Sequence, residues 1–160
     1  MLTRALDPER IESVKAGMIA ALIGSAVTAL FVGVDSLIAS LVNGLPVGTP
    51  AIFTPALVPQ AIRRLVIGAV CCFLFGVTYR YIIRQDSNPH LRSGAVGAFA
   101  LTRSLSQLES IELSELTLAN ILPLGITITE SFGLFLSVRL VLDLGLRQQW
   151  LKPFLVDSEP

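Results

Sequence analysis

The sequence has few charged residues: 15% of its 160 residues are Asp, Glu, Lys or Arg, whereas soluble domains typically carry about 25%. Its 12 basic and 12 acidic residues cancel, and no basic patch interleaved with aromatic side chains is present. A chain without net charge has no long-range electrostatic attraction for nucleic acid. We therefore expect that nucleic acid is not a partner. Hydrophobic residues make up 52% of the chain and the mean hydropathy is +0.70, so the composition indicates a helical membrane protein.

Residues that carry out chemistry are also scarce. The single histidine, His90, has no second histidine, cysteine pair or carboxylate spaced to complete a metal site. Cys71 and Cys72 are adjacent, which rarely satisfies disulfide geometry, so we interpret them as small packing residues. No nucleophile motif, phosphate-binding glycine loop or Cys-x-x-Cys pair occurs. We therefore expect no enzyme activity, no catalytic residue and no metal or other cofactor.

Residues 64–84 form the central apolar stretch, RLVIGAVCCFLFGVTYRYIIR. This stretch has no period-two alternation and is hydrophobic around the whole circumference of a helix, which predicts either a buried core helix or a membrane span. Tyr79 and Tyr81 beside Arg80 and Arg84 are typical of a membrane interface, where arginine side chains extend toward the headgroups. These residues favour the membrane span.

Uncharged runs separated by turn residues predict a single transmembrane domain with four helices. The first uncharged run, 16–34, is long enough to cross the hydrocarbon core at about 1.5 Å per residue. The third span has only ten uncharged residues before Arg103, and a re-entrant or surface helix is its alternative. The predicted fold is an all-α, four-helix transmembrane bundle with an amphipathic C-terminal helix at the interface; the spans are 16–41, 65–83, 92–108 and 116–138, and the interfacial helix is 139–152.

Basic residues are distributed unequally between the two sides of such a bundle. If both termini are cytoplasmic, that side carries nine basic residues, whereas the opposite side carries only Arg63 and Arg64. Positive charge marks the cytoplasmic side, and this excess arises only for an even number of spans, which favours four. We expect an integral protein of a plasma or thylakoid membrane with both termini cytoplasmic or stromal.

Several charged side chains fall within or beside the predicted spans. From the helix rise, Arg103 lies about 16 Å and Glu130 about 13 Å from the cytoplasmic side, so the two share a depth. A lone charge at this depth is unfavourable, and we expect an intramembrane ion pair between Arg103 and Glu130. Asp35 lies about 30 Å from the cytoplasmic side, which predicts a second, outer-face clamp of Asp35, Arg63 and Arg64.

Small residues recur every four positions in three of the predicted spans. Such a stripe allows the backbone of another helix to approach closely. We expect helix-packing faces at Gly17, Ala21 and Ser25, at Gly68, Cys72 and Gly76, and at Gly94 and Ala98.

Two segments carry a resemblance to known proteins. Residues 75–81 (FGVTYRY), followed by Arg84 and Asp86, and residues 91–99 (LRSGAVGAF) resemble small integral membrane proteins of cyanobacteria that have chloroplast relatives. The resemblance covers about a quarter of the chain. It implies a photosynthetic membrane, and no catalytic residue can be carried over from it.

These features lead to two functional hypotheses. The first is a structural or assembly subunit of a larger membrane complex, whose partners are the lipid bilayer and other membrane protein subunits. The second is a small oligomeric transporter or channel, a homo-oligomer in which Glu130 is the titrating intramembrane group.

Overall fold

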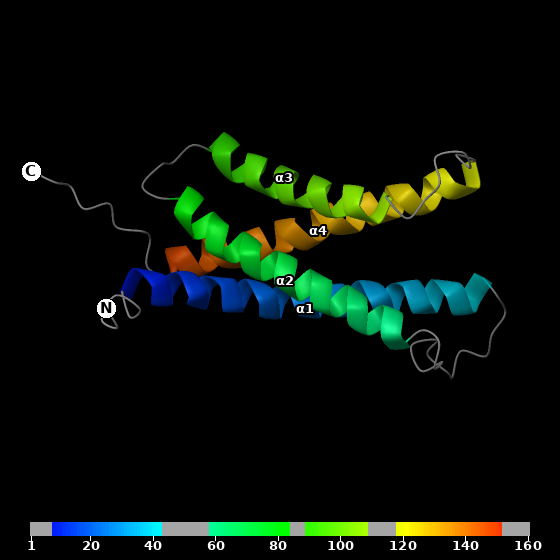
Figure 1. The fold of residues 1–160 in the computed structure, drawn as a ribbon, viewed down its shortest axis with the longest axis horizontal. Coiled ribbons are helices and arrows are strands. Elements are labelled where there is room, and N and C mark those ends of the chain that lie inside the picture. The colour runs from blue at the N-terminus through cyan, green and yellow to red at the C-terminus, as the bar shows by residue number, and fades with distance from the viewer. Residues whose placement is uncertain (1–7, 43–57, 84–88, 109–117, 152–160) are drawn as a thin grey trace, which may run out of the picture.

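The computed structural model describes residues 8–42, 58–83, 89–108 and 118–151, and these ranges are helical apart from short turns. Their four helices are α1 (Pro8–Val42), α2 (Val58–Ile82), α3 (Pro89–Leu108) and α4 (Leu118–Arg147), as Figure 1 shows. Proline is the first residue of α1 and α3 and the second of α2, where its missing amide leaves no helical hydrogen bond unmade. The described part of the chain confirms the predicted all-α fold with four helices.

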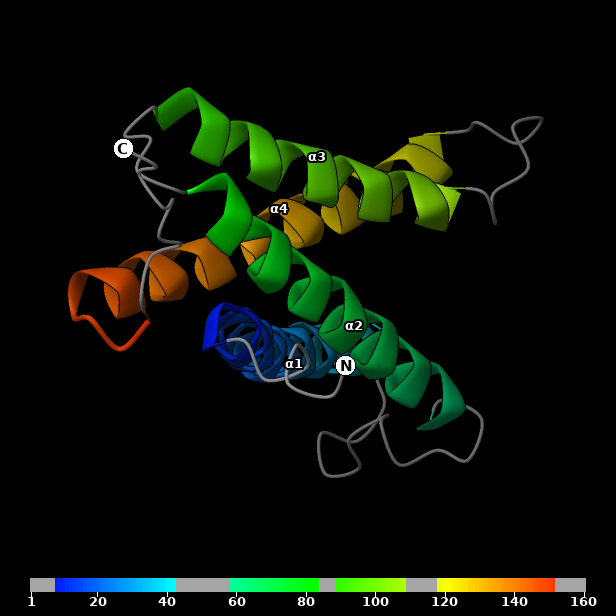
Figure 2. The ribbon, with the colours of Figure 1, turned by 60° about the vertical axis from the view of Figure 1, so that its left-hand side comes forward.

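The helices pack as two antiparallel pairs that are joined along α4. The most extensive contacts are between α1 and α2, followed by those between α3 and α4 and between α1 and α4. Figures 1 and 2 show α1 and α2 crossing on one side of the bundle, with α3 lying along α4 on the other. The start of α1 and the end of α4 are at the same end of the bundle, which we call the terminal end (Figure 1).

Three of the four helices are long and apolar enough to cross a membrane, judged by length and composition. The segments that meet this criterion are Arg10–Ile38, Ala61–Ile82 and Gly125–Arg147. Their outward faces are apolar and include Leu22, Leu30, Val66, Val70, Leu136 and Leu140, all exposed in the isolated chain. Such faces suit a lipid environment and would be unfavourable in water.

Helix α3 does not meet this criterion, although its 20 residues span about 30 Å. The predicted crossing of the membrane by the third span therefore stays a prediction.

The C-terminal part of the bundle differs from the predicted boundary at residue 138. Helix α4 continues without a break to Arg147, so no separate interfacial helix begins at 139, and residues 116, 117 and 152 of the predicted helices lie outside the described ranges. The predicted boundary assumes that the charged Arg139 lies outside the membrane. It instead pairs with Asp143 one turn later, with 3.7 Å between Arg139 Nε and Asp143 Oδ2, so its charge is compensated within the helix.

Aromatic rings fill the centre of the bundle. The ring of Phe75 on α2 lies 5.3 Å from the rings of both Phe99 on α3 and Phe135 on α4, and stacks at 5.2 Å on Tyr79. Phe99 and Phe135 are 5.7 Å apart, which closes the group. Phe75 and Phe135 are completely buried. We call Phe75, Phe99 and Phe135 the aromatic core.

Buried small residues bring α1 and α2 into close contact. Gly68, Cys72 and Gly76 of the predicted stripe on α2 are all buried. A Cβ atom added to Gly76 would lie 2.5 Å from the Cβ of Ala20 and 2.7 Å from the carbonyl oxygen of Ala16, so the α1 backbone passes directly over Gly76. This contact requires glycine.

The predicted stripe on α1 is partly displaced. Gly17 is buried, but Ala21 and Ser25 are only half-buried, and the buried positions that follow Gly17 are Ala20, Gly24 and Thr28. A helix with 3.6 residues per turn drifts away from a strict four-residue repeat, so the contact line follows spacings of three and four.

The stripe on α3 does not lie inside the bundle. Gly94 and Ala98 are exposed, and a Cβ atom added to Gly94 would have no atom within 4 Å. The expected packing face points away from the other helices of this chain.

Helix α4 ends in a Schellman motif whose left-handed residue is not glycine. Gln149 has φ 59°, its amide donates to the carbonyl of Leu146, and the amide of Trp150 donates to the carbonyl of Gly145. The motif turns the chain back so that Leu151 is buried against Gly145.

A glycine at this position should stabilise the protein. Left-handed backbone is unfavourable for residues with a Cβ atom, so we expect Gln149→Gly to raise the free energy of unfolding by about 1 kcal/mol. Titration of the purified protein with SDS, followed by far-UV circular dichroism, measures this change. Gln148→Gly is the matched control, because among the described non-glycine residues only Gln149 has a positive φ. An equal effect of both substitutions would contradict the explanation.

Candidate functional site: a charge cluster from four helices

The end of the bundle opposite the terminal end contains an ion pair between α1 and α2. Arg64 Nη1 donates to Asp35 Oδ2 at 2.9 Å. Arg63, the other arginine of the predicted clamp, is exposed and does not pair with Asp35. The clamp is thus formed by Asp35 and Arg64 alone. Arg63 points elsewhere because the side chains of adjacent residues on a helix differ in direction by about 100°.

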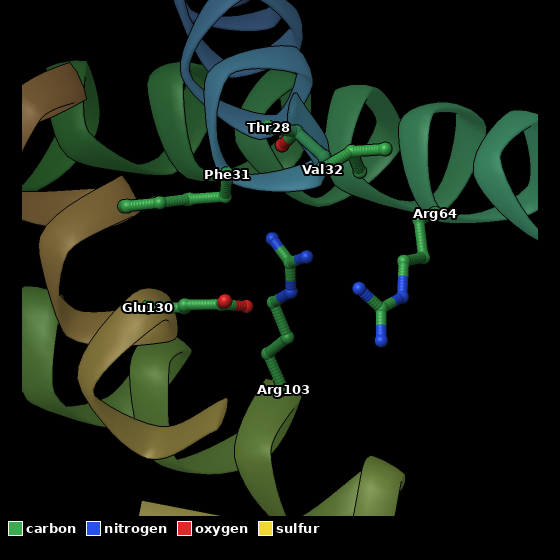
Figure 3. A pocket seen from close by; sticks show the side chains of 6 residues that line it. All are labelled: Thr28, Phe31, Val32, Arg64, Arg103 and Glu130. Carbon is green, nitrogen blue, oxygen red and sulfur yellow. The ribbon is translucent and has the colours of Figure 1, made fainter. Parts of the chain in front are cut away.

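Two further charges, from α3 and α4, join this ion pair. Arg64, Arg103 and Glu130 line the same pocket, together with Thr28, Phe31 and Val32. Figure 3 shows the three charged side chains directed into one space from three different helices. The Glu130 carboxylate is repelled by Asp35 and attracted by Arg64 and, more weakly, by Arg103. We call Asp35, Arg64, Arg103 and Glu130 the charge cluster; it takes one residue from each helix.

The sequence predicted that the Arg103–Glu130 pair and the clamp of Asp35 lie at different depths in the membrane. In the structure both groups belong to one cluster. The predicted depth of Glu130 places the end of the last span at Arg139, but α4 runs eight residues, or about 12 Å, further. Glu130 therefore lies closer to the opposite end than predicted, beside Arg64. Arg103 and Glu130 face the same pocket, but no direct ion pair between them is present among the described residues.

Three buried polar atoms of the pocket have no hydrogen-bond partner in the described ranges: Thr28 Oγ1, Arg103 Nε and Arg103 Nη1. Gly68 makes room for them, because a Cβ atom at this position would lie 2.8 Å from Thr28 Oγ1 and 3.7 Å from Arg103 Nη1. A buried polar group without a partner is destabilising by about 1–3 kcal/mol. The pocket therefore combines a neutral set of charges with unused hydrogen-bonding capacity.

The composition of the charge cluster limits its chemistry. Its two carboxylates are offset by two guanidinium groups, which disfavour a metal cation, and no group of three His, Cys, Asp or Glu that could hold a metal occurs in the described ranges. Arginine does not lose its proton in proteins, so Glu130 and Asp35 are the titratable members of the cluster. The arrangement can hold four helices together and can bind a small polar molecule.

A second polar network, at the terminal end, was not predicted from the sequence. Its centre is Asp143 on α4, which accepts a hydrogen bond of 2.9 Å from Tyr79 Oη and lies 3.7 Å from Arg92 Nη1 as well as from Arg139. Arg139 Nη1 also donates to Ser93 Oγ at 3.3 Å. The network joins α2, α3 and α4, and the spacing of Arg139 and Asp143 by four residues was the sequence signal for part of it.

Two hydrogen bonds connect α1 to the rest of the chain at the terminal end. Arg80 was expected to extend toward lipid headgroups, but it is 4% exposed and its Nη1 donates to Ser13 Oγ at 2.6 Å. Lys15 Nζ donates to the carbonyl of Trp150 at 2.9 Å. The tyrosine and arginine pattern of residues 79–81 thus reflects helix–helix contacts at Tyr79 and Arg80, whereas Tyr81 is exposed.

Comparison with known proteins adds no constraint to this site. The chain matches no model of a known protein family, and it matches neither a curated protein nor a solved structure.

Proposed function

We propose that this protein is a non-catalytic structural or assembly subunit of a larger membrane complex. The observation that carries the proposal is the outward face of α3. Gly94, Ala98, Thr102 and Ser106 follow one another at intervals of four residues, and all are exposed. Small residues at this spacing allow another helix to pack closely in a membrane.

The polarity of α3 supports the same proposal. It is the helix of the four that is not apolar enough to count as a membrane span, and it contacts mainly α4. A helix of this composition is poorly suited to facing lipid along its open side, whereas a helix of another subunit can cover the small residues and satisfy its hydroxyl groups. With such a partner, α3 crosses the membrane as the third span.

The internal polar groups favour a structural role over transport. The charge cluster is neutral, and the aromatic core separates it from the network at the terminal end. Transport of protons or ions needs polar groups or water along the whole path. The charge cluster is therefore best explained as a connection among the four helices.

We propose that both termini face the cytoplasm or stroma. Six of the nine described basic residues lie at the terminal end, and positive charge is enriched on the cytoplasmic side. The resemblance of residues 75–81 and 91–99 to small membrane proteins of cyanobacteria favours a photosynthetic membrane. There the protein would contact subunits of a thylakoid membrane complex.

Mild detergent extraction from native membranes tests the assembly role. We expect the protein to migrate with other membrane subunits, and we expect Ala98→Leu to reduce the co-migrating fraction severalfold, because the larger side chain prevents close approach at the α3 face. Quantitative mass spectrometry of the extracted complex measures this fraction.

The matched control is Ala29→Leu, which enlarges an exposed alanine on α1. It should leave the complex intact. A wild-type protein that extracts as a monomer or as a homo-oligomer alone would contradict the assembly role.

The alternative, a small oligomeric transporter, is favoured by one observation: the Glu130 carboxylate lies in a pocket with unused hydrogen-bonding capacity. It requires proton-coupled flux in reconstituted vesicles that Glu130→Gln abolishes. We expect no flux above that of protein-free vesicles, measured with a pH-sensitive dye inside the vesicles. Flux that depends on Glu130 would replace the structural proposal.

A further inference from the structure

We propose that Arg92 on α3 and Arg139 on α4 together bind the phosphate group of an anionic lipid at the terminal end of the bundle. Both arginines belong to the polar network centred on Asp143. The inference requires that the protein lies in a bilayer, but it does not depend on the assembly role.

This network carries more positive than negative charge. Arg92 Nη1 lies 3.7 Å from Asp143 Oδ1, and Arg139 Nε lies 3.7 Å from Asp143 Oδ2. Both distances are longer than a hydrogen bond, and the Tyr79 hydroxyl already donates to Asp143 Oδ1 at 2.9 Å. Two guanidinium groups therefore share one carboxylate within the described ranges, which leaves one positive charge that a bound anion can offset.

Both arginine side chains can be reached from outside the bundle. Arg92 is 31% and Arg139 is 21% exposed, whereas the carboxylate that they share is the least exposed of the three, at 19%. Arg139 Nη1 donates at 3.3 Å to the hydroxyl of Ser93, which follows Arg92 in the first turns of α3 and is exposed. A guanidinium group presents its N–H donors in a planar fork that matches phosphate oxygens. The two helices thus offer two such groups to one anion.

The surroundings of the arginines favour the phosphate of a lipid over a free phosphate. Leu91 precedes Arg92, Leu140 follows Arg139, and both leucines are exposed. At the same end of the bundle Trp150 is exposed, and tryptophan is enriched at membrane interfaces. Basic side chains between membrane helices are a common binding site for anionic headgroups, and the neighbouring leucines can contact the acyl chains.

The excess charge also selects an anionic headgroup over a zwitterionic one. Phosphatidylglycerol brings one negative charge, which makes the site neutral. Phosphatidylcholine brings the same phosphate together with a quaternary ammonium group, which the two arginines would repel. We therefore expect the site to prefer phosphatidylglycerol.

Tryptophan quenching by brominated lipids can measure this preference. The chain has one tryptophan, Trp150, so Leu91→Trp in a Trp150→Phe background places a single reporter beside Arg92. The full-length protein is reconstituted into bilayers of phosphatidylglycerol and phosphatidylcholine, with one lipid brominated at a time. We expect phosphatidylglycerol to be enriched severalfold over its bulk fraction at this reporter. Leu30→Trp on the outward face of α1, in the same background, is the control reporter and should show no enrichment.

Substitution of both arginines connects the enrichment to the proposed site. Arg92→Gln combined with Arg139→Gln should abolish it, whereas Arg92→Lys combined with Arg139→Lys keeps the charges and should retain part of it. Arg10→Gln is the matched control, because it removes an exposed arginine of α1 at the same end and should change nothing. An equal loss in Arg10→Gln would show general attraction to the basic end and would overturn the proposal.

Asp143→Asn gives a result of the opposite sign. It removes the negative charge that the arginines share and keeps an acceptor for the Tyr79 hydroxyl, so the enrichment should rise severalfold. A purely structural network would instead lose order, and a fall in enrichment would contradict lipid binding. This variant tests the proposal even where the arginine variants do not fold.

Two outcomes with the unsubstituted arginines would also overturn the proposal. The first is equal enrichment at the Leu91 and Leu30 reporters. The second is loss of the enrichment in excess inorganic phosphate, because that result would assign the site to a soluble anion.

Discussion

Glu130→Leu is expected to lower the free energy of unfolding by about 1–3 kcal/mol, because it leaves two arginines and one carboxylate in the charge cluster. Asp35 is already paired with Arg64, so this substitution removes the second carboxylate that offsets the charge of Arg103 in the cluster. An arginine cannot respond by losing its proton. SDS titration of the purified protein, monitored by far-UV circular dichroism, gives the change.

Arg103→Leu should be less destabilising than Glu130→Leu. The carboxylate that remains can bind a proton and become neutral, which lowers the energy of its burial. The double variant Arg103→Leu and Glu130→Leu should be more stable than Glu130→Leu alone, because no uncompensated arginine remains.

Arg63→Leu serves as the control for these variants. Arg63 is exposed and outside the charge cluster, so its replacement should change stability by less than about 1 kcal/mol. A loss for Glu130→Leu no larger than this, or a double variant less stable than both single ones, would contradict the structural role of the charge cluster.

Gly76→Ala is expected to lower the free energy of unfolding by about 1–3 kcal/mol, the usual penalty for forcing an extra methyl group into a packed core. The new Cβ atom would lie 2.7 Å from the backbone carbonyl oxygen of Ala16, and a backbone atom cannot rotate away as a side chain can. Helices α1 and α2 would have to move apart along their most extensive contact.

The control for Gly76→Ala has to account for the higher helix propensity of alanine. Gly33→Ala does this, since Gly33 lies within α1 and a Cβ atom there would have no atom within 4 Å. It should leave stability unchanged or raise it by up to about 1 kcal/mol. Equal behaviour of the two variants in the SDS titration would show that α1 and α2 do not pack through Gly76.

The number and type of the helices could be predicted because they depend on local sequence. Long uncharged runs predicted α1, α2 and α4, whereas the third span was predicted from residue 92 and α3 begins three residues earlier, at Pro89. The end of α4 could not be predicted in this way. A charged residue usually marks the end of a span, and Arg139 does not because Asp143 compensates it one turn later.

The candidate site could be predicted only in part. Because the rise per residue of a helix is fixed, the residue count predicted that Arg103 and Glu130 lie at one depth in the membrane and that Asp35 and Arg64 lie at another. It could not show that all four charges share a pocket, because this depends on the offset between helices. Likewise, the spacing of Gly94 and Ala98 defines a face of α3 but does not say which neighbour that face meets.

The aromatic core also limits the passage of water and ions through the bundle. Phe75, Phe99 and Phe135 meet at ring distances of 5.3–5.7 Å and lie between the two polar ends of the bundle. Water and ions do not enter a tightly packed apolar section of this kind. The same rings that hold α2, α3 and α4 together thus also keep the two polar ends of the bundle apart.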